Sequence, residues 1–183
     1  MKKDEPFNPE QKSSGPPAGL LFRLATKLDR DAIAGLMAER NPDQDYSEVV
    51  HRTDRELETL ESDPKYRLFV ADLNEEVLGF CRFYDSGGLP ESRKVFPGPE
   101  GWYAMGTLIR VDWRRRGIAR FLSVNRLREL RKLGATEVYS IVDSENLTSM
   151  RMHSAFGYEQ VAQANGFLHL TFKNGGVLFR LNL

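Results

Sequence analysis

The chain lacks several features that mark specialised classes of protein. Its one cysteine, Cys81, excludes an internal disulfide and a C-x-x-C metal site. None of its apolar runs reaches the roughly 18 residues that a membrane helix needs, and its opening residues, MKKDEPFNPEQKSSGPP, lack the apolar stretch of a secretory signal. It also lacks net charge, because 26 Lys and Arg residues balance 26 Asp and Glu residues. We therefore expect a cytosolic, reduced protein, in which any surface for nucleic acid or membrane must be local.

What remains is the composition of an ordinary folded protein. The 183 residues are 40% hydrophobic and 28% charged, which is enough for a core and excludes a wholly disordered chain. Residues 1–18 are polar and rich in Pro, Ser, Lys and Glu, so we expect a flexible tail there. The length suits one domain, which we place at residues 19–183.

Hydrophobic periodicity divides that domain into strands and helices. Asp29 or Asp31 is expected to begin the first helix, and Asn41-Pro42-Asp43 to end it. The expected strands lie at 20–24, 68–71, 77–81, 102–111 and 138–142, with helices around 33–37 and at 47–61, 117–133 and 146–156. Residues 158–183 alternate apolar and polar around the sequence KNGG at 173–176, which predicts a hairpin turn there. The whole predicts a mixed α/β sheet whose parallel crossover is the segment 102–142.

A basic turn between the strand at 102–111 and the longest helix is the most informative segment. A glycine there opens the helix, whose first N–H groups and dipole favour an anion. The segment from Arg110 to Lys132 contains nine basic residues and only two acidic ones. A solvated helix face explains such charges equally well. The sequence contains neither of the two common phosphate motifs, G-x-x-x-x-G-K-[ST] and G-x-G-x-x-G.

The run Arg114-x-x-Gly117-x-Ala119 resembles the [QR]-x-x-G-x-[GA] pyrophosphate loop of the GCN5-related N-acetyltransferase (GNAT) superfamily. Residues 146–158, NLTSMRMHSAFGY, resemble the second signature of its phosphinothricin-type branch, N-x-x-S-x-R-x-H-x-x-x-G-[FY]. The two motifs stand in the family's order, separated by one strand, and the resemblance covers roughly residues 20–183.

The resemblance implies the acyl-CoA N-acyltransferase fold, a mixed, mostly antiparallel central sheet of about seven strands flanked by about four helices. It also implies that acetyl-CoA is a co-substrate and that no metal is needed. Backbone groups of Thr107, Leu108 and Ile109 would pair with the pantetheine arm, and Asn146 would contact the donor nearby. The strand residues Ser140, Ile141 and Val142 would border the thioester. The diphosphate would be held by amides of Arg114, Arg115, Arg116, Gly117, Ile118 and Ala119.

Two residues are candidates for the proton transfers of such a reaction. An alkylamine has a pKa near about 10 and must lose a proton before it attacks. The family often uses a Glu at the positions of Tyr103 or Ala104, or of Ile141, and none is a carboxylate here. We therefore name Tyr103 as a water-mediated relay, with Glu100 and Asp85 as weaker alternatives. His153 stands where the family often has a Tyr that protonates the departing thiolate; its plainer interpretation is a helix histidine bonded to backbone.

The acceptor is expected to be a primary amine of a small molecule, attacked directly. Eleven acidic residues between Asp29 and Asp63 could attract a cationic amine, or simply form solvated helix faces. Three alternatives stay open: a non-catalytic acyl-CoA sensor, acetylation of a protein amine, and a longer acyl donor. Nucleic-acid binding by the arginines is a fourth. The loop 85–101, with four glycines and three prolines, is a candidate lid or dimer contact.

Overall fold

The structure, a computed structural model, describes residues 15–89, 92 and 94–183. Its strands are β1 (Leu21–Leu24), β2 (Tyr66–Leu73), β3 (Glu76–Asp85), β4 (Trp102–Ile109), β5 (Glu137–Asp143), β6 (Glu159–Phe167) and β7 (Leu170–Asn182). Its α-helices within these residues are α1 (Arg30–Arg40), α2 (Tyr46–Ser62), α3 (Ile118–Lys132) and α4 (Leu147–Ala155). Of the helices described, none combines the length and apolar character needed to cross a membrane.

The strands form one seven-stranded sheet in the order β1-β2-β3-β4-β5-β7-β6. β4 and β5 are parallel, whereas β1–β2, β2–β3, β5–β7 and β6–β7 are antiparallel. The expected mixed, mostly antiparallel sheet and its parallel crossover are therefore confirmed. Every helix and every strand before residue 158 was expected within a few residues of its observed bounds.

The described residues fall into two compact units. The α3 unit contains the described residues up to Tyr84 together with Met105–Leu133, and the α4 unit contains Asp85–Ala104 together with Gly134–Leu183. β4 contributes its beginning to the α4 unit and its end to the α3 unit. Most of the expected tail, residues 1–14, lies outside the described residues, so the division into tail and domain stays a prediction.

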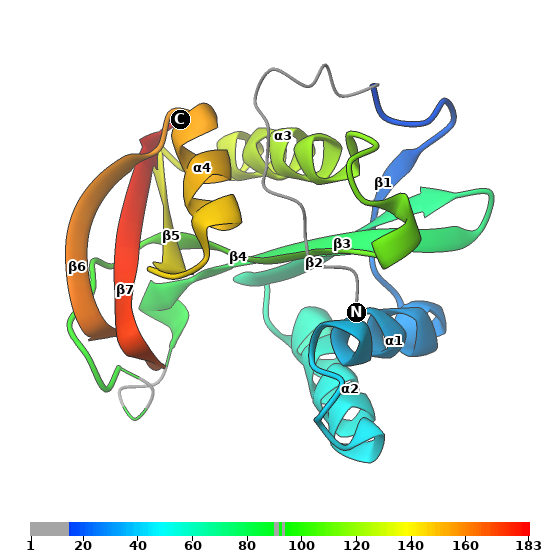
Figure 1. Ribbon diagram of the computed structural model, residues 1–183, viewed down its shortest axis with the longest axis horizontal. Coiled ribbons are helices and arrows are strands. Elements are labelled where there is room, and N and C mark those ends of the chain that lie inside the picture. The colour runs from blue at the N-terminus through cyan, green and yellow to red at the C-terminus, as the bar shows by residue number, and fades with distance from the viewer. Residues whose placement is uncertain (1–14, 90–91, 93) are drawn as a thin grey trace. The chain divides into compact units, whose positions relative to one another are not determined.

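In the α3 unit, α3 covers one face of the β2–β3 pair, and α1 and α2 cover the other (Figure 1). Asp45 begins α2 as its N-cap and accepts hydrogen bonds from the amides of Ser47 (2.8 Å) and Glu48 (3.2 Å). The turn between β2 and β3 is Asn74-Glu75, both left-handed with φ of +52° and +70°, as a two-residue hairpin turn requires. The apolar faces of α1, α2, β2 and β3 meet in one core that includes Ile33, Leu36, Val49, Leu57, Leu68, Val70 and Phe80.

In the α4 unit, β7 pairs with β5 on one side and with β6 on the other (Figure 1). The expected hairpin exists, but the predicted position of its turn was wrong. Phe167 pairs with Leu170, so the turn is Leu168-His169, and Leu168 is left-handed with φ +51°. The sequence KNGG lies inside β7, where the register jumps and Gly175 has φ +96°. Its glycines permit a bulge within the strand, not a reversal.

The expected long loop at 85–101 is described except for residues 90, 91 and 93. It begins with a 3₁₀ turn over Ser86–Gly88, and Phe96 later forms an isolated bridge with Leu168. The Phe96 ring packs where a side chain at Gly166 would stand, since a Cβ there would lie 2.6 Å from it. This part of the loop is therefore fastened to the β6–β7 hairpin.

β3 and β4 approach closely at Gly79, where only a glycine fits. A Cβ at this position would lie 2.6 Å from the carbonyl oxygen of Leu108 and 3.3 Å from the Cα of Ile109. Both contacts are to backbone, which a rotamer change cannot relieve. The end of β4 is thus set by the absence of one side chain on β3.

We predict that Gly79→Ala destabilises the protein by about 1–3 kcal/mol, the usual penalty for overpacking a close contact. Gly35→Ala is the matched control, because Gly35 lies within α1 and a Cβ there meets nothing within 4 Å. That control should be stabilising by about 0.5–1 kcal/mol. Urea denaturation of the three proteins measures both effects, and an equal stability of Gly79→Ala and the wild type would contradict the close approach.

Candidate functional site

The turn before α3 presents main-chain N–H groups in the way the sequence predicted. A 3₁₀ turn, Val111–Trp113, follows β4, and Arg115 is left-handed with φ +63°. Gly117 is also left-handed, with φ +75°, and is the N-cap of α3; among the described residues no side chain caps this helix. Left-handed residues in a tight turn direct neighbouring N–H groups to one side, and the helix adds its positive dipole end. The backbone therefore has the geometry of an anion site.

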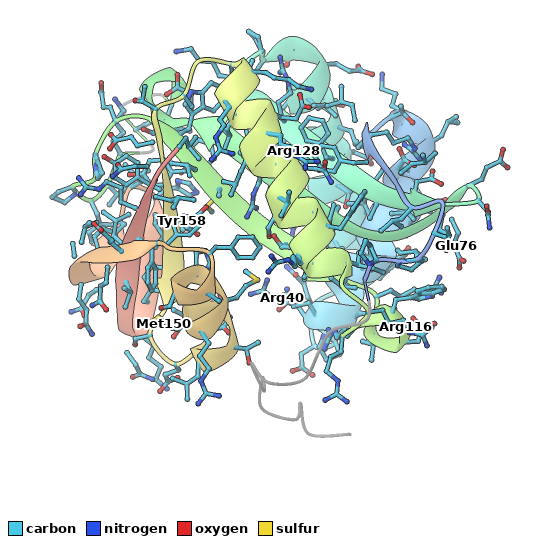
Figure 2. All side chains as sticks on the ribbon, turned by 90° about the horizontal axis from the view of Figure 1, so that it is seen from above. Arg40, Glu76, Arg116, Arg128, Met150 and Tyr158 are labelled. Atoms are coloured by element: carbon cyan, nitrogen blue, oxygen red, sulfur yellow. The ribbon has the colours of Figure 1, made fainter. Side chains whose placement is uncertain are left out.

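The arginines of this turn are exposed, and two of them are oriented by contacts. The Arg116 guanidinium lies 4.8 Å from the centroid of the Trp113 ring, and Arg114 Nε donates to the Ile109 carbonyl at 3.3 Å. Figure 2 shows Arg116 at the turn that leads into α3. Arg114, Arg115 and Arg116 thus give the turn a positive potential. Within the described part of the chain, no salt bridge holds the Arg116 side chain.

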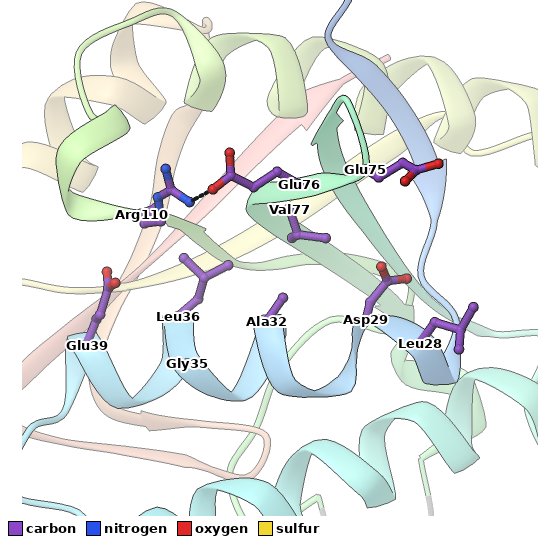
Figure 3. A pocket seen from close by; sticks show the side chains of 10 residues that line it. All are labelled: Leu28, Asp29, Ala32, Gly35, Leu36, Glu39, Glu75, Glu76, Val77 and Arg110. Carbon is purple, nitrogen blue, oxygen red and sulfur yellow. Dashed lines mark hydrogen bonds and ion pairs between the residues drawn. The ribbon is translucent and has the colours of Figure 1, made fainter.

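Arg110, counted among the basic residues of the turn, has a different role. Its guanidinium binds Asp112 at 2.7 Å and also contacts Glu76. The hydrogen bond to Asp112 raises the pKa of Arg110 and lowers that of Asp112. Arg110 also lines a cleft of about 380 Å³ beside α1 (Figure 3). In that cleft Glu39 accepts a hydrogen bond from the Val111 amide at 3.3 Å, which joins α1 to the end of β4.

β4 is irregular at Gly106, just before the predicted pantetheine strand of Thr107, Leu108 and Ile109. Gly106 has φ +36°, and a Cβ there would lie 2.9 Å from Arg82 Nη2 and 3.1 Å from Arg82 Nε. The side chain of Arg82, from β3, therefore packs directly against the Gly106 backbone. Any larger residue at position 106 would displace this guanidinium.

A second arginine, Arg126 of α3, contacts the same region of β4. Its Nη1 lies 3.4 Å from the Met105 carbonyl, 3.3 Å from Thr107 Oγ1 and 3.5 Å from the Arg82 carbonyl. Arg126 is only 4% exposed, its Nε has no hydrogen-bond partner, and no carboxylate of the described residues forms an ion pair with it. A buried cation with only neutral oxygens around it must be held where it is by those oxygens. It therefore fixes the backbone on both sides of Gly106.

Arg82 itself is paired with Glu56 of α2, and Glu56 Oε2 accepts a hydrogen bond from the Tyr66 hydroxyl at 3.2 Å. The Arg82 and Glu56 side chains are about one-fifth exposed. Burial, and then the neighbouring Glu56 charge, raise the pKa of Tyr66, so its hydroxyl keeps its proton. The Glu56 carboxylate of α2 is thus connected to β4 through the Arg82 guanidinium, whereas β4 itself contains no Asp or Glu.

In the α4 unit, His153 is buried and both of its ring nitrogens are engaged. Nδ1 lies 2.7 Å from the Ser149 carbonyl, and Nε2 lies 2.8 Å from Ser140 Oγ on β5. Ser140 Oγ also donates to the Ala104 carbonyl of β4 at 3.1 Å. The ring stacks on Phe179 and meets Tyr158 edge-on. The backbone contact of the plainer interpretation is present, and a side-chain contact accompanies it.

The other two predicted residues of this unit also have partners. Tyr103 is fully buried, and its hydroxyl donates to the Pro99 carbonyl at 2.8 Å. Asn146 is the N-cap of α4, and its side-chain oxygen accepts from the Ser149 amide at 3.0 Å.

Four residues around these sites were not singled out as site residues from the sequence, or received only an implied place. Arg126 follows Leu122 and precedes Leu130 by four residues each, so helical spacing already put it on the buried face of α3. Ser140 alternates with Val138 and Val142 on the buried face of β5. Both are polar residues in apolar stripes, which was the available signal. The pairing of Glu56 with Arg82 joins two distant segments and had no local signal.

Comparison with solved structures gives close matches in fold at low sequence identity. The ribosomal-protein-alanine N-acetyltransferase of Brucella melitensis has 16% identity and a TM-score of 0.69, over 90% of this chain and 100% of that one. The protein yncA of Salmonella typhimurium, determined with its cofactor acetyl-CoA, has 20% identity and a TM-score of 0.67, over 90% and 94%. NAA60 of Arabidopsis thaliana, in complex with a bisubstrate analogue, has 17% identity and a TM-score of 0.63, over 89% and 97%.

Comparison with curated proteins by sequence gave no significant match. A family model, the acetyltransferase (GNAT) family, matches residues 31–158, which include the α3 turn and α4. The match covers more than half of the chain and agrees with the resemblance to the GNAT superfamily. The chain belongs to the GNAT family of acetyltransferases.

Proposed function

We propose that this chain is an N-acetyltransferase that moves the acetyl group of acetyl-CoA to a primary amine of a small molecule. The single observation that carries this is the turn from Arg114 to Ala119. It joins two left-handed residues, an uncapped helix start and exposed arginines, all of which favour a diphosphate. The residues fit the donor. The Arg114 amide already donates to the Val111 carbonyl at 3.3 Å, so the diphosphate would be held by the amides of Arg115, Arg116, Gly117, Ile118 and Ala119. Thr107, Leu108 and Ile109 would bind the pantetheine arm, and Asn146 would lie near it.

The acetyl group is attacked directly by the amine, without an acyl-enzyme. The one cysteine, Cys81, is fully buried and its thiol contacts the Leu122 carbonyl at 3.9 Å. Burial raises the pKa of Cys81 from its ordinary value of 9.0 to about 11, so the nucleophilic thiolate is scarce at neutral pH. Ser140 contacts His153 Nε2 at 2.8 Å, but it is buried and its hydroxyl donates to the Ala104 carbonyl at 3.1 Å.

The amine must lose a proton, and β4 offers no carboxylate for this. Tyr103 remains the predicted relay, although its hydroxyl proton is directed to Pro99. Glu56, oriented by Arg82 and Tyr66, is a second group that could take the proton through water. The half-buried Glu56 and Arg82 also suit an acceptor that carries charge. The likeness of residues 146–158 to phosphinothricin-type enzymes supports an amino-acid-like amine.

Two further candidates have specific support. The lack of a carboxylate on β4 favours an acyl-CoA sensor that does not turn over. The name of the Brucella neighbour, a ribosomal-protein-alanine N-acetyltransferase, favours a protein amine. A panel of amino acids, polyamines and peptide N-termini, assayed with acetyl-CoA, separates all three: binding of CoA without transfer to any amine would leave the sensor.

We predict that Gly117→Glu abolishes CoA binding in calorimetry, because a negative side chain would stand at the diphosphate. Gly134→Glu is the matched control. Gly134 follows the other end of α3, has a similar φ of +80°, and meets nothing within 4 Å. Both variants therefore carry the same left-handed penalty of about 1–2 kcal/mol and the same charge. Unchanged affinity in Gly117→Glu, or equal losses in both variants, would contradict the location of the diphosphate.

We predict that the Cys81 thiol reacts with a disulfide reagent only after denaturation, because the folded protein buries it and raises its pKa. The raised pKa also has a defined effect on stability. Below pH 9 both states hold the proton; between pH 9 and about 11 only the unfolded state loses it, so the free energy of unfolding falls. Cys81→Ala should show a smaller fall over this window in urea titrations. Rapid labelling of the native protein at pH 8 would refute the buried thiol.

A further inference from the structure

Three hydrogen-bond contacts run in series from α4 to β4 in the α4 unit. The Ser149 carbonyl contacts His153 Nδ1 at 2.7 Å, His153 Nε2 contacts Ser140 Oγ at 2.8 Å, and Ser140 Oγ contacts the Ala104 carbonyl at 3.1 Å. Ser140 and His153 are 4% and 6% exposed, so water does not readily replace any of these partners. The series therefore has to be satisfied by the protons of the two side chains themselves.

Counting protons shows what the series requires. Carbonyl oxygens at both ends can only accept, so Nδ1 must carry a proton and the Ser140 hydroxyl proton must point to Ala104. The middle contact then needs a third proton, on Nε2. A neutral histidine and a serine supply two protons, whereas an imidazolium and a serine supply three. The neutral state leaves one contact without a proton, and the charged state fills all three.

Ser140 occupies a specific position on β5. The parallel pairing of β4 with β5 is at Tyr103 and Tyr139, and the Ser140 hydroxyl makes the next contact, to Ala104. A side-chain hydroxyl thus stands between the two strands one residue after their backbone pair. Under the proposed function the thioester lies along this part of β5, so the hydroxyl is the polar group that a departing sulfur would meet.

We propose that Ser140 is the group that protonates the leaving sulfur and that His153 supplies its proton; this rests on the proposed acetyl transfer. As the amine nitrogen bonds to the acetyl carbon, the C–S bond breaks and its electron pair stays on sulfur. The Ser140 hydroxyl proton leaves its contact with the Ala104 carbonyl and goes to sulfur, and Ser140 takes the proton of His153 Nε2. His153 ends neutral, with its Nδ1 proton still on Ser149. The proton released by the amine goes to solvent, and one proton from solvent restores the imidazolium.

The groups packed against His153 are compatible with an imidazole that gains and loses a proton. Phe179 of β7 stacks on the ring at 5.2 Å, Tyr158 meets it edge-on at 4.9 Å, Ser149 lies on the same helix and Ser140 on β5. Tyr158 is the titratable group among these four neighbours. Burial opposes the imidazolium, whereas the aromatic face and the acceptor contacts at its two ring nitrogens favour it.

His51 offers a matched control for the histidine. On α2 its Nδ1 lies 2.7 Å from the carbonyl of Ser47, the same contact four residues back that His153 makes to Ser149. His51 is exposed, and the contact that the structure gives its ring is to the Ser47 carbonyl on its own helix. His51→Gln therefore removes the shared helix contact without removing a relay.

The first test measures acetyl transfer with acetyl-CoA and the amine that the wild-type chain acetylates best. In Ser140→Ala and in His153→Gln, kcat should fall at least about tenfold, as for a lost acid–base group, with the acetyl-CoA KM changed by less than about twofold. The double variant should lose no more than the worse single variant, because the groups act in series. His51→Gln should keep the wild-type kcat. A Ser140→Ala kcat within about twofold of wild type, or losses that multiply in the double variant, overturns the relay.

The second test follows the imidazole nitrogens by ¹⁵N NMR and needs no turnover. His153, assigned by its absence in His153→Gln, should hold its Nε2 proton to higher pH in the wild type than in Ser140→Ala, while His51 titrates identically in both. An unchanged His153 titration overturns the contact to Ser140. A wild-type chain that binds acetyl-CoA but acetylates no amine overturns the proposed function and the sulfur step with it. An active chain that tolerates Ser140→Ala overturns the relay alone.

Discussion

The backbone at Gly106 is the constraint on which the α3 unit depends. Arg82 packs against it from β3, and Arg126 holds the carbonyls of Met105 and Arg82 from α3. Each arginine links β4 to a further element. Arg82 pairs with Glu56 of α2, and Arg126 belongs to the buried face of α3. Because Arg126 has only neutral oxygens around it, a movement of β4 would leave its buried guanidinium charge without hydrogen-bond acceptors. The position of Thr107–Ile109, where the donor is proposed to pair, is therefore set by the guanidinium groups of Arg82 and Arg126 and by the lack of a side chain at Gly106.

Local sequence patterns were sufficient for most of the fold. Helices α2 and α3 each have an apolar stripe and a residue that begins or ends them, Asp45 before α2 and Gly134 after α3, where φ is +80°. The turn that is proposed to hold the diphosphate is equally local, since Gly117 and the arginines around it are contiguous in sequence. Patterns of this kind depend on neighbours within a few residues, which is why both the element types and the turn were predictable.

Where prediction failed, the deciding partner was distant in sequence. The KNGG sequence has the composition of a hairpin turn, yet pairing with β5 and β6 keeps it inside β7 as a bulge. Arg110 was counted among the basic residues of the turn; it pairs with Asp112, two residues away, and the folded chain also brings Glu76 to it. Glu56 and Arg82 likewise meet only in the folded chain. At KNGG, tertiary pairing overrode a local preference.

The two sequence interpretations of His153, a catalytic acid and a helix histidine bonded to backbone, are not exclusive. The bond from Nδ1 to Ser149 fixes the ring so that Nε2 faces β5, as a backbone carbonyl does for many functional histidines. His51 has the same bond and faces solvent, so the bond alone confers no function. What distinguishes His153 is the contact of its Nε2 with the hydroxyl of Ser140 on β5. A buried acid that acts through a serine reaches a sulfur that its own ring need not touch.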